Sequence, residues 1–280
     1  MRAVVISGKG QVTYKEDYNN KFKLKTGQVL IKVEAAVINP SDLYRMQGDY
    51  DDNDDLYYPN TAGVEGSGTV TASGGGFMAN RLVGKRVGFV RGDEYGSYGE
   101  YSITKAMQCI PLDDKISWEQ GACSFVNPVT AVGLLDVARK HNVKACIQNG
   151  AASQLGRMII RLFKEQGIPL INIVRREEQV TLLKEKYGAD YVLNSTDENF
   201  DKELYNLSKQ LKCNVALECV AGKETGRLIQ CLSENGVCIN YGKLSEEDIG
   251  PINPIVFIFR CQRLESFFLP TWLESKWIWQ

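Results

Sequence analysis

The feature that most constrains the fold of this chain is a strand, a tight turn and an amphipathic helix over residues 146–163. The strand Cys146-Ile147-Gln148 is short and largely apolar, and it ends at the turn dipeptide Asn149-Gly150. The helix then has apolar residues at positions i, i+3, i+4, i+7 and i+8, the spacing of one buried helical face. These residues are Leu155, Met158, Ile159, Leu162 and Phe163. The sequence therefore predicts the first half of a βαβ unit.

The turn between this strand and helix is a candidate phosphate-binding loop. Amides of a turn and of a helix N-terminus that face open space can bind a pyrophosphate. The glycine motif of dinucleotide-binding domains is present as Ala151-x-Ser153-x-x-Gly156, with one of its three glycines. We expect Gly156 to let the helix approach the strand closely. The candidate cofactor-binding residues here are Ala152, Ser153, Gln154, Leu155 and Gly156.

Two arginines follow the next predicted strand, at residues 170–174. A site for NAD normally has Asp or Glu about 20 residues beyond the glycines, where the carboxylate binds the ribose 2′-OH. This chain has Arg175 and Arg176 there. A carboxylate repels a 2′-phosphate, whereas a guanidinium binds it with two hydrogen bonds. The arginines therefore favour NADPH over NADH, and the alternative is an ordinary βαβ unit with surface arginines.

Composition limits the class of protein. A length of 280 residues allows two domains, and 44% hydrophobic with 24% charged residues is usual for globular proteins. A formal net charge of −1 gives no reason to expect nucleic acid or a membrane surface as partner, and no apolar run is long enough for a membrane span. The first residues, 1–6, predict a strand and not a signal or transit peptide.

The number and spacing of the cysteine and histidine residues argue against disulfide bonds and against a bound metal ion. The eight cysteines are scattered without a CxxC, and four lie in apolar or periodic segments. We expect buried free thiols in a reducing compartment, the cytoplasm or alternatively the mitochondrial matrix. The single histidine, His141, lies in a lysine-rich connection and is expected to be solvated. No Cys or His residues have the spacing of a zinc site. The four cysteines are Cys146, Cys219, Cys231 and Cys238.

The chain divides into two patterns. Short strands separated by turn residues fill residues 1–125, at a spacing typical of a β-barrel, with strands at 29–35, 68–70, 84–89 and 99–103. Helices and strands alternate from Trp118 onward, which predicts a doubly wound parallel sheet. A helix is expected over 119–135 with a break at Pro128. Later helices are expected near 178–187, 202–211 and 224–232, and strands at 191–193, 215–217, 237–241 and 266–269.

Several segments in fixed order resemble the medium-chain dehydrogenase/reductase superfamily, most of all its zinc-free branch of quinone reductases and 2-enoyl thioester reductases. The resemblance implies a GroES-like β-barrel catalytic domain at 1–125 and a Rossmann NADPH-binding domain at 126–280, with the active site between them. The matching segments are Ile38-Asn39-Pro40-Ser41-Asp42-Leu43, Gln47-Gly48-Asp49-Tyr50, Gly63-Val64-Glu65-Gly66-Ser67-Gly68, Val126-Asn127-Pro128-Val129-Thr130-Ala131, Ile147-Gln148-Asn149, Ile171-Asn172-Ile173-Val174-Arg175, Glu218-Cys219-Val220-Ala221-Gly222-Lys223, Tyr241-Gly242 and Phe267-Phe268-Leu269-Pro270-Thr271-Trp272.

The sequence departs from this family in two places. Zinc-dependent relatives carry a cysteine ligand near Ser41-Asp42 and further cysteines for a structural zinc, and this chain has neither. This departure fits the metal-free branch. Family members also continue well past Trp279, where their last helices return to the catalytic domain. That C-terminal return is therefore expected to be missing here, either because the chain is truncated or because part of the site has been lost.

The resemblance also implies roles for individual residues. Tyr50 and Asn127 are the candidate catalytic residues: Tyr50 would donate a proton, and Asn127 and Thr130 would lie beside the nicotinamide. Tyr241, Gly242, Phe267, Phe268 and Leu269 would line the nicotinamide half of the cofactor. Each has an alternative structural role: loop packing for Tyr50, capping and turn roles for Asn127 and Thr130, and packing at the end of the sheet for the others.

The expected function is zinc-independent, NADPH-dependent reduction of an activated C=C bond (2-enoyl thioester, enal or enone) or of a quinone. The alternative is a catalytically inactive, reductase-like subunit of a larger assembly. Aspartates surround Tyr50 and are either a solvated charge run or a barrier to phosphate-bearing thioesters. Family members often dimerise through the last sheet strand, expected here at Phe267-Phe268-Leu269. The aspartates are Asp49, Asp51, Asp52, Asp54 and Asp55.

Overall fold

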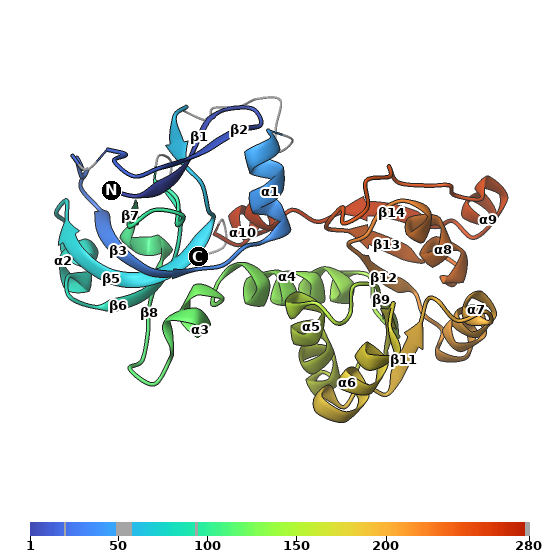
Figure 1. The fold of residues 1–280 in the computed structure, drawn as a ribbon. Helices are drawn as coiled ribbons and strands as arrows, with labels where there is room; N and C mark the ends of the chain where they lie inside the picture. Colours follow the sequence, from blue (N-terminus) through green and yellow to red (C-terminus); the bar gives the residue numbers. More distant parts are fainter. Residues whose placement is uncertain (20, 49–57, 93–94, 278–280) are drawn as a thin grey trace. The chain divides into compact units, whose positions relative to one another are not determined.

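The structure is a computed structural model that describes residues 1–19, 21–48, 58–92 and 95–277. The chain forms two compact units, Met1–Val126 and Asn127–Gln280. The first is built mainly from antiparallel strands, and the second alternates strands with helices (Figure 1). This arrangement confirms the predicted fold class, a GroES-like domain followed by a Rossmann domain.

The first unit contains two antiparallel sheets. The smaller has the order β2-β1-β4, with β1 at Ala3–Gly8, β2 at Gln11–Lys15 and β4 at Asn60–Thr61. The larger has the order β7-β3-β5-β6-β8. Its strands are β3 (Gln28–Ala36), β5 (Glu65–Ser73), β6 (Arg86–Val90), β7 (Tyr101–Lys105) and β8 (Cys109–Pro111), joined by helices α1 (Pro40–Gln47), α2 (Phe77–Leu82) and α3 (Trp118–Ala122) and the 3₁₀ turn η1 (Ala106–Gln108).

A small apolar core holds the larger sheet together. Alternate residues of β3, such as Val29 and Ile31, point inward and pack with Val87 and Phe89 of β6. Gly68 of β5 has no room for a side chain, because a Cβ there would lie 2.1 Å from the carbonyl oxygen of Lys32. The four strands predicted for this region are all present, each within a few residues of its expected ends.

The second unit is a six-stranded parallel sheet with the order β11-β10-β9-β12-β13-β14. Crossover helices connect its strands, as expected for a doubly wound sheet. The strands are β9 (Cys146–Gln148), β10 (Leu170–Val174), β11 (Tyr191–Asn194), β12 (Val215–Glu218), β13 (Val237–Asn240) and β14 (Arg263–Ser266). The helices are α4 (Val126–Lys140), α5 (Gln154–Glu165), α6 (Glu177–Tyr187), α7 (Phe200–Leu211), α8 (Lys223–Cys231), α9 (Pro254–Phe259) and α10 (Leu269–Trp277).

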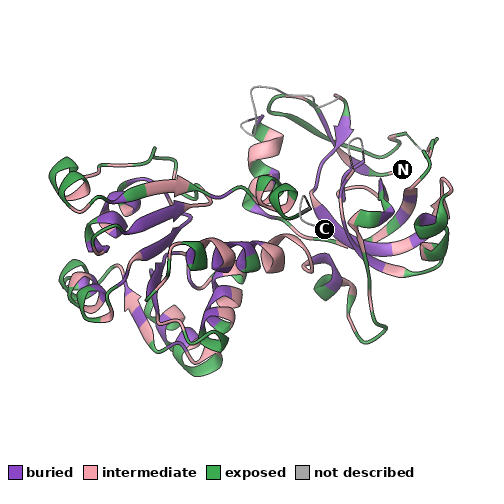
Figure 2. Cartoon of the chain, turned by 180° about the vertical axis from the view of Figure 1, so that it is seen from behind, coloured by how far each residue is buried: buried purple, intermediate pink, exposed green. Residues whose placement is uncertain are grey.

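Both faces of the central strands β9, β10 and β12 are buried (Figure 2). Neighbouring residues of a strand enter different cores: Cys146 packs with α4, α5 and α6, whereas Ile147 packs with α7 and α8. A parallel sheet covered on both sides needs apolar residues at nearly every strand position. The predicted buried face of α5 is confirmed, because all five of its apolar residues pack in the first of these cores.

The break in the first long helix lies earlier than predicted. Helix α3 ends at Ala122 and α4 begins at Val126, so Pro128 lies inside the first turn of α4. A proline is tolerated there because the amide it lacks has no partner within the helix. Helix α4 also continues to Lys140, five residues beyond the expected end at Leu135.

The last strand and the histidine also differ from the predictions. The sixth strand is Arg263–Ser266, so Phe267 follows the strand and Leu269 begins a helix. His141 is not solvated: its side chain is 16% exposed, and its Nε2 lies 2.9 Å from Oε2 of Glu265 in β14. The longer helix α4 accounts for this contact, because it carries His141 to the edge of the sheet.

The four cysteines expected to be buried are buried, and all eight cysteines are free. Among the described residues, no helix has both the length and the apolar character needed to cross a membrane.

Candidate cofactor-binding site

The predicted phosphate-binding turn adopts a capped helix start. Ser153 is the N-cap of α5, and its Oγ accepts a hydrogen bond of 3.0 Å from the amide of Gly156. The amide of Ser153 donates to the carbonyl oxygen of Gly150, at 2.9 Å. Gly150 has φ +59, a conformation that favours glycine. The motif that retains one conventional glycine therefore still forms a tight turn.

This turn leaves amides available to an anion. Gln154 and Leu155 are in the first turn of α5, where helix geometry provides no acceptor for the amide. Within the described part of the chain, the amides of Gln154, Leu155 and Ala152 have no hydrogen-bond acceptor. Ser153 and Gln154 are exposed. Exposed amides at the positive end of a helix dipole fit a pyrophosphate.

Gly156 makes the close approach predicted from the sequence. A Cβ on this residue would lie 2.5 Å from the carbonyl oxygen of Ala151 and 2.7 Å from its Cα. Gln148 of β9 also links strand and helix, because its Nε2 donates to the carbonyl oxygen of Gly156 at 3.1 Å. Any larger residue at position 156 would push the helix away from the turn.

Arg175 and Arg176 lie at the carboxyl end of β10, next to β9 in the sheet. Both are exposed, and no ion pair of the described residues involves either of them. The amide of Arg175 donates to Oε1 of Gln179 at 3.1 Å, and Arg176 is the N-cap of α6. The backbone is therefore fixed while both guanidinium groups remain available to a phosphate.

The segments expected near the nicotinamide all belong to the second unit. Asn127 and Thr130 are in the first two turns of α4, and Thr130 is 8% exposed. Tyr241 and Gly242 follow β13 directly, and both are partly buried.

The segment after β14 is held by packing. Phe267 is buried, and its ring fills the space above Gly133 of α4. Phe268 is 49% exposed, and Leu269 packs partly against the same core as Phe267. Packing at the end of the sheet thus accounts for the position of Phe267, whereas Phe268 is only half buried.

A buried carboxylate at the end of β12 was not singled out as a site residue by the sequence. Glu218 is 0% exposed, and its Oε1 accepts a hydrogen bond of 2.9 Å from Nδ2 of Asn149, the residue that begins the predicted phosphate-binding turn. Its Oε2 accepts one from Nδ2 of Asn240, next to Tyr241. One signal could have identified it: it is a charged residue directly after the apolar run Val215–Leu217.

The titratable side chains beside Glu218 stay protonated. Burial raises the pKa of the Cys219 thiol to about 11. Burial also raises the pKa of the Tyr241 hydroxyl well above its usual value. Both groups are therefore neutral at physiological pH and act as hydrogen-bonding groups only.

Tyr50 and the surrounding aspartates lie outside the described residues. Their proposed roles stay predictions.

The first unit has its own buried polar cluster, in two of the segments that carry the resemblance. Nδ2 of Asn39 donates to Oε1 of Glu65 at 3.0 Å, and the amide of Val126 donates to Oε2 of Glu65 at 2.8 Å. The amide of Asn39 donates to Asp42 Oδ2 at 2.7 Å. Burial raises the pKa of both carboxyl groups. Among the described residues, no three His, Cys, Asp or Glu side chains are grouped so that they could hold a metal ion.

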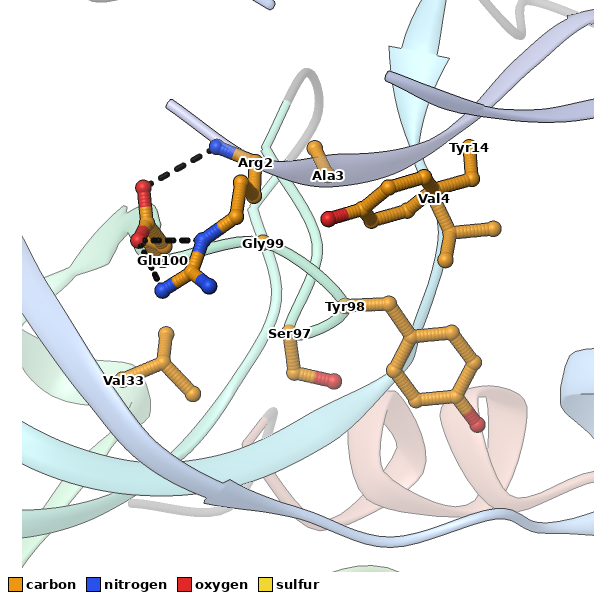
Figure 3. A pocket seen from close by; sticks show the side chains of 9 residues that line it. All are labelled: Arg2, Ala3, Val4, Tyr14, Val33, Ser97, Tyr98, Gly99 and Glu100. Atoms are coloured by element: carbon orange, nitrogen blue, oxygen red, sulfur yellow. Dashed lines mark hydrogen bonds and ion pairs between the residues drawn. The ribbon is translucent and has the colours of Figure 1, made fainter. Parts of the chain in front are cut away.

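The first unit also contains an open cavity of about 350 Å³ (Figure 3). An ion pair between Arg2 and Glu100, 2.7 Å apart, lies in it. None of the predicted site residues that the structure describes lines this cavity, so we do not assign it to the cofactor. The lining residues are Arg2, Ala3, Val4, Tyr14, Val33, Ser97, Tyr98, Gly99 and Glu100.

Comparisons with protein families agree with this architecture. Residues 25–114 match the alcohol dehydrogenase GroES-like domain, and residues 155–279 match the zinc-binding dehydrogenase domain.

Individual relatives are reductases. A mitochondrial enoyl-[acyl-carrier-protein] reductase of Caenorhabditis elegans is 31% identical over 265 residues, which cover 91% of this chain and 72% of the relative. A proposed NADPH:quinone reductase of Mesorhizobium loti is 33% identical, with a TM-score of 0.84 over 98% of this chain and 83% of the other. The 2-enoyl thioester reductase heterodimer of Candida tropicalis shares the fold at 22% identity, with a TM-score of 0.79 over 98% of this chain and 83% of the other.

These relatives give no support to the alternative of an inactive structural subunit. Two findings establish the family. The chain is 31% identical to the reductase of Caenorhabditis elegans and covers more than two thirds of its length, and the two family domains match in the expected order. The chain belongs to the medium-chain dehydrogenase/reductase superfamily, in its zinc-free branch of quinone reductases and 2-enoyl thioester reductases.

Proposed function

We propose that this protein uses NADPH to reduce an activated C=C bond, as in a 2-enoyl thioester, an enal or an enone, or to reduce a quinone. One observation carries the proposal. Among the described residues, the turn at the end of β9 has amides without an acceptor at a helix N-terminus, and the neighbouring strand β10 ends in two exposed arginines that pair with no described carboxylate. A pyrophosphate and a 2′-phosphate need these two groups in this order along the chain.

The residues present fit NADPH. The amides of Ala152, Gln154 and Leu155 would bind the pyrophosphate, and Gly156 leaves the room that a Cβ would close. Arg175 and Arg176 would bind the 2′-phosphate. The nicotinamide half would lie against Asn127, Thr130, Tyr241, Gly242 and the segment Phe267-Phe268-Leu269.

The chemistry divides between cofactor and protein. Bound NADPH supplies a hydride, and the protein has to position the substrate and supply a proton. Tyr50 would donate that proton to the carbon next to the activating carbonyl. The aspartates around Tyr50 in the sequence would disfavour substrates with several phosphates, because like charges weaken binding and slow association. A neutral enal, enone or quinone therefore suits this chain better than a coenzyme A thioester.

The test is turnover by the purified chain. Incubated with NADPH, the chain should oxidise the cofactor when an enal, an enone or a benzoquinone is added, and NADH should be a poorer donor. Activity should persist after treatment with EDTA, because the described residues provide no ligand cluster for zinc. No loss of NADPH absorbance with any substrate class, together with unchanged NADPH fluorescence, would contradict the proposal.

We also propose that two copies of the chain pair through β14, at the edge of the parallel sheet. Along a strand, the backbone groups of successive residues point alternately to one neighbour and to the other. The amides of Arg263 and Phe267 donate toward β13, so every second residue between them directs its amide and carbonyl group outward, away from β13. Helix α9, directly before this strand, exposes Ile255, Ile258 and Phe259 by 61%, 63% and 78%. An outer edge that no other described strand pairs with, beside exposed apolar side chains, favours association with a second copy.

Sedimentation tests the pairing. The chain should sediment with twice its mass of 31.3 kDa. Ser266→Pro should yield the single mass, because proline removes an outward amide without removing a bond to β13. The melting temperature of the variant controls for loss of fold. A folded Ser266→Pro variant that keeps the double mass would show that the copies associate elsewhere.

The free thiols and the names of the relatives support a proposal for the compartment. All eight cysteines are free, which suits a reducing compartment. The curated relatives are named as mitochondrial enzymes. We therefore propose the cytoplasm or the mitochondrial matrix.

A further inference from the structure

Glu218 is a buried carboxylate that the proposed chemistry does not use. It is the last residue of β12, the strand beside β9 in the middle of the sheet, and it is 0% exposed. No ion pair among the described residues involves it. A carboxylate without a cation is costly to bury unless several donors bind it. The buried Glu218 carboxylate is therefore expected to be stabilised by hydrogen-bond donors.

Five donors surround this carboxylate. Oε1 accepts hydrogen bonds from the amides of Val220 and Ala221, both 2.7 Å away, in addition to the one from Asn149. Oε2 accepts from Oγ1 of Thr225 at 3.3 Å in addition to the one from Asn240. Val220 and Ala221 precede helix α8, so the carboxylate also lies at the positive end of that helix.

The donors connect the loops at the ends of three neighbouring strands. Asn149 begins the phosphate-binding turn after β9, and its Oδ1 accepts from the amide of Cys219 at 2.9 Å. Asn240 ends β13, and its Nδ2 also donates to the carbonyl oxygen of Gly242 at 3.0 Å. The amide of Tyr241 donates to the carbonyl oxygen of Glu218 at 2.9 Å. One side chain thus joins the segments assigned to the pyrophosphate and to the nicotinamide.

The backbone next to Glu218 is strained. Ala221 has φ +67, a left-handed conformation that residues with a Cβ rarely adopt. Such residues persist where the surrounding structure holds them, and they gather at functional sites. The hydrogen bond from the Ala221 amide to Oε1 of Glu218 supplies part of that restraint.

We propose that Glu218 is a positioning residue that holds the turn after β9 and the Tyr241–Gly242 segment in the arrangement that binds NADPH. This inference rests on the proposed function. Glu218 itself need not touch the cofactor, because it acts through Asn149 and Asn240.

Glu218→Gln tests the inference with little change in shape. The glutamine Oε1 can keep the hydrogen bonds from Asn149, Val220 and Ala221. Its Nε2 would replace Oε2 and would face Nδ2 of Asn240, so that two donors oppose each other. Relief requires Asn240 to turn its amide, which places its oxygen against the carbonyl oxygen of Gly242. The variant therefore loosens the Tyr241–Gly242 side and leaves helix α8 in place.

Two readouts are needed, one of them independent of cofactor. In the protein without cofactor, amide hydrogen exchange of residues 240–245 should be faster in the Glu218→Gln variant. The dissociation constants of NADPH and NADP⁺ should both rise about fivefold, the effect of losing roughly one buried hydrogen bond. Affinity should be measured well below the melting temperature, so that global unfolding does not contribute.

Ser208→Ala is the matched control. Ser208 is buried in the same unit, and its hydroxyl donates to the carbonyl oxygen of Cys231 near the C-terminal ends of α7 and α8. Loss of this bond should lower the melting temperature but change neither the exchange of residues 240–245 nor the affinity for NADPH. An effect of Glu218→Gln that Ser208→Ala reproduces would mean that general stability is responsible, and the inference would be wrong.

The outcomes separate this inference from the proposed function. If the unmodified chain binds no NADPH, both the proposed function and the assignment of Glu218 to that site are wrong. If the unmodified chain binds NADPH and Glu218→Gln shifts neither affinity nor hydrogen exchange, only the role of Glu218 is wrong. Faster exchange together with weaker NADPH binding would support the inference.

Discussion

Tyr50→Phe should lower kcat for an enal or enone by about 10²–10⁴-fold, the usual contribution of general-acid catalysis, while NADPH binding persists. The reason is the asymmetry of C=C reduction. The hydride goes to one carbon, and the neighbouring carbon needs a proton at the same time. Phenylalanine keeps the ring and removes only the hydroxyl, so folding should be nearly unchanged. Steady-state kinetics with NADPH at saturation measures the effect.

Quinones provide the internal control for this prediction. Reduction of a quinone generates an oxygen anion that water protonates readily, so the same substitution should cost much less activity. Conversely, an unchanged kcat for enone reduction in the Tyr50→Phe variant would mean that Tyr50 is structural and that another group supplies the proton.

The sequence predicts secondary structure best for strands that are buried on both faces of the sheet. Strands such as Leu170–Val174 are entirely buried, so nearly every position must be apolar and the strand is recognisable without its partners. The amphipathic stripe of α5 was recognisable for the same reason, because burial of one face fixes a period of 3.6 residues. Local patterns of this kind determine element type, and alternation of the elements then determines fold class.

Predictions failed where tertiary contacts set the boundaries. The aromatic pair Phe267-Phe268 is typical of a strand, yet β14 ends at Ser266 because its register is set by pairing with Val237–Asn240. The gap between α3 and α4 depends on a distant residue, since Oε2 of Glu65 accepts the hydrogen bond from the amide of Val126. The sequence predicts a solvated His141 because its partner, Glu265, is 124 residues away along the chain.

In the candidate site, too, local features could be predicted from the sequence, whereas contacts between distant residues could not. The turn and the two arginines are local in sequence and could be predicted from the pattern. The role of Glu218 could not, because Asn149 is 69 and Asn240 is 22 residues away from it. Only the parallel order of β9, β12 and β13 brings their carboxyl ends together. A charged residue at the end of an apolar strand is a signal for such a network, but it does not name the partners.

Replacing both Arg175 and Arg176 by alanine should abolish the preference for NADPH over NADH. A hydrogen bond to a charged group contributes about 1.5–3 kcal/mol, so loss of even one to the 2′-phosphate should weaken NADPH binding tenfold or more. NADH has no 2′-phosphate, and its affinity should hardly change. Fluorescence titration of both cofactors against the unmodified protein and the double variant measures the preference directly, and the two single variants divide the effect between the arginines.

The matched control removes the same amount of charge from the far end of the helix that follows the arginines. Lys184 and Lys186 lie in the last turn of α6, which begins next to Arg176, and both are exposed. Lys184→Ala with Lys186→Ala lowers the net charge by two, as the arginine double variant does, but at the opposite end of the helix. If general attraction between a positive surface and an anionic cofactor were responsible, both double variants would weaken NADPH binding alike. If the guanidinium groups bind the phosphate directly, only the arginine variant should do so. Equal affinities of the unmodified protein for NADPH and NADH would show instead that the arginines are ordinary surface residues of a βαβ unit.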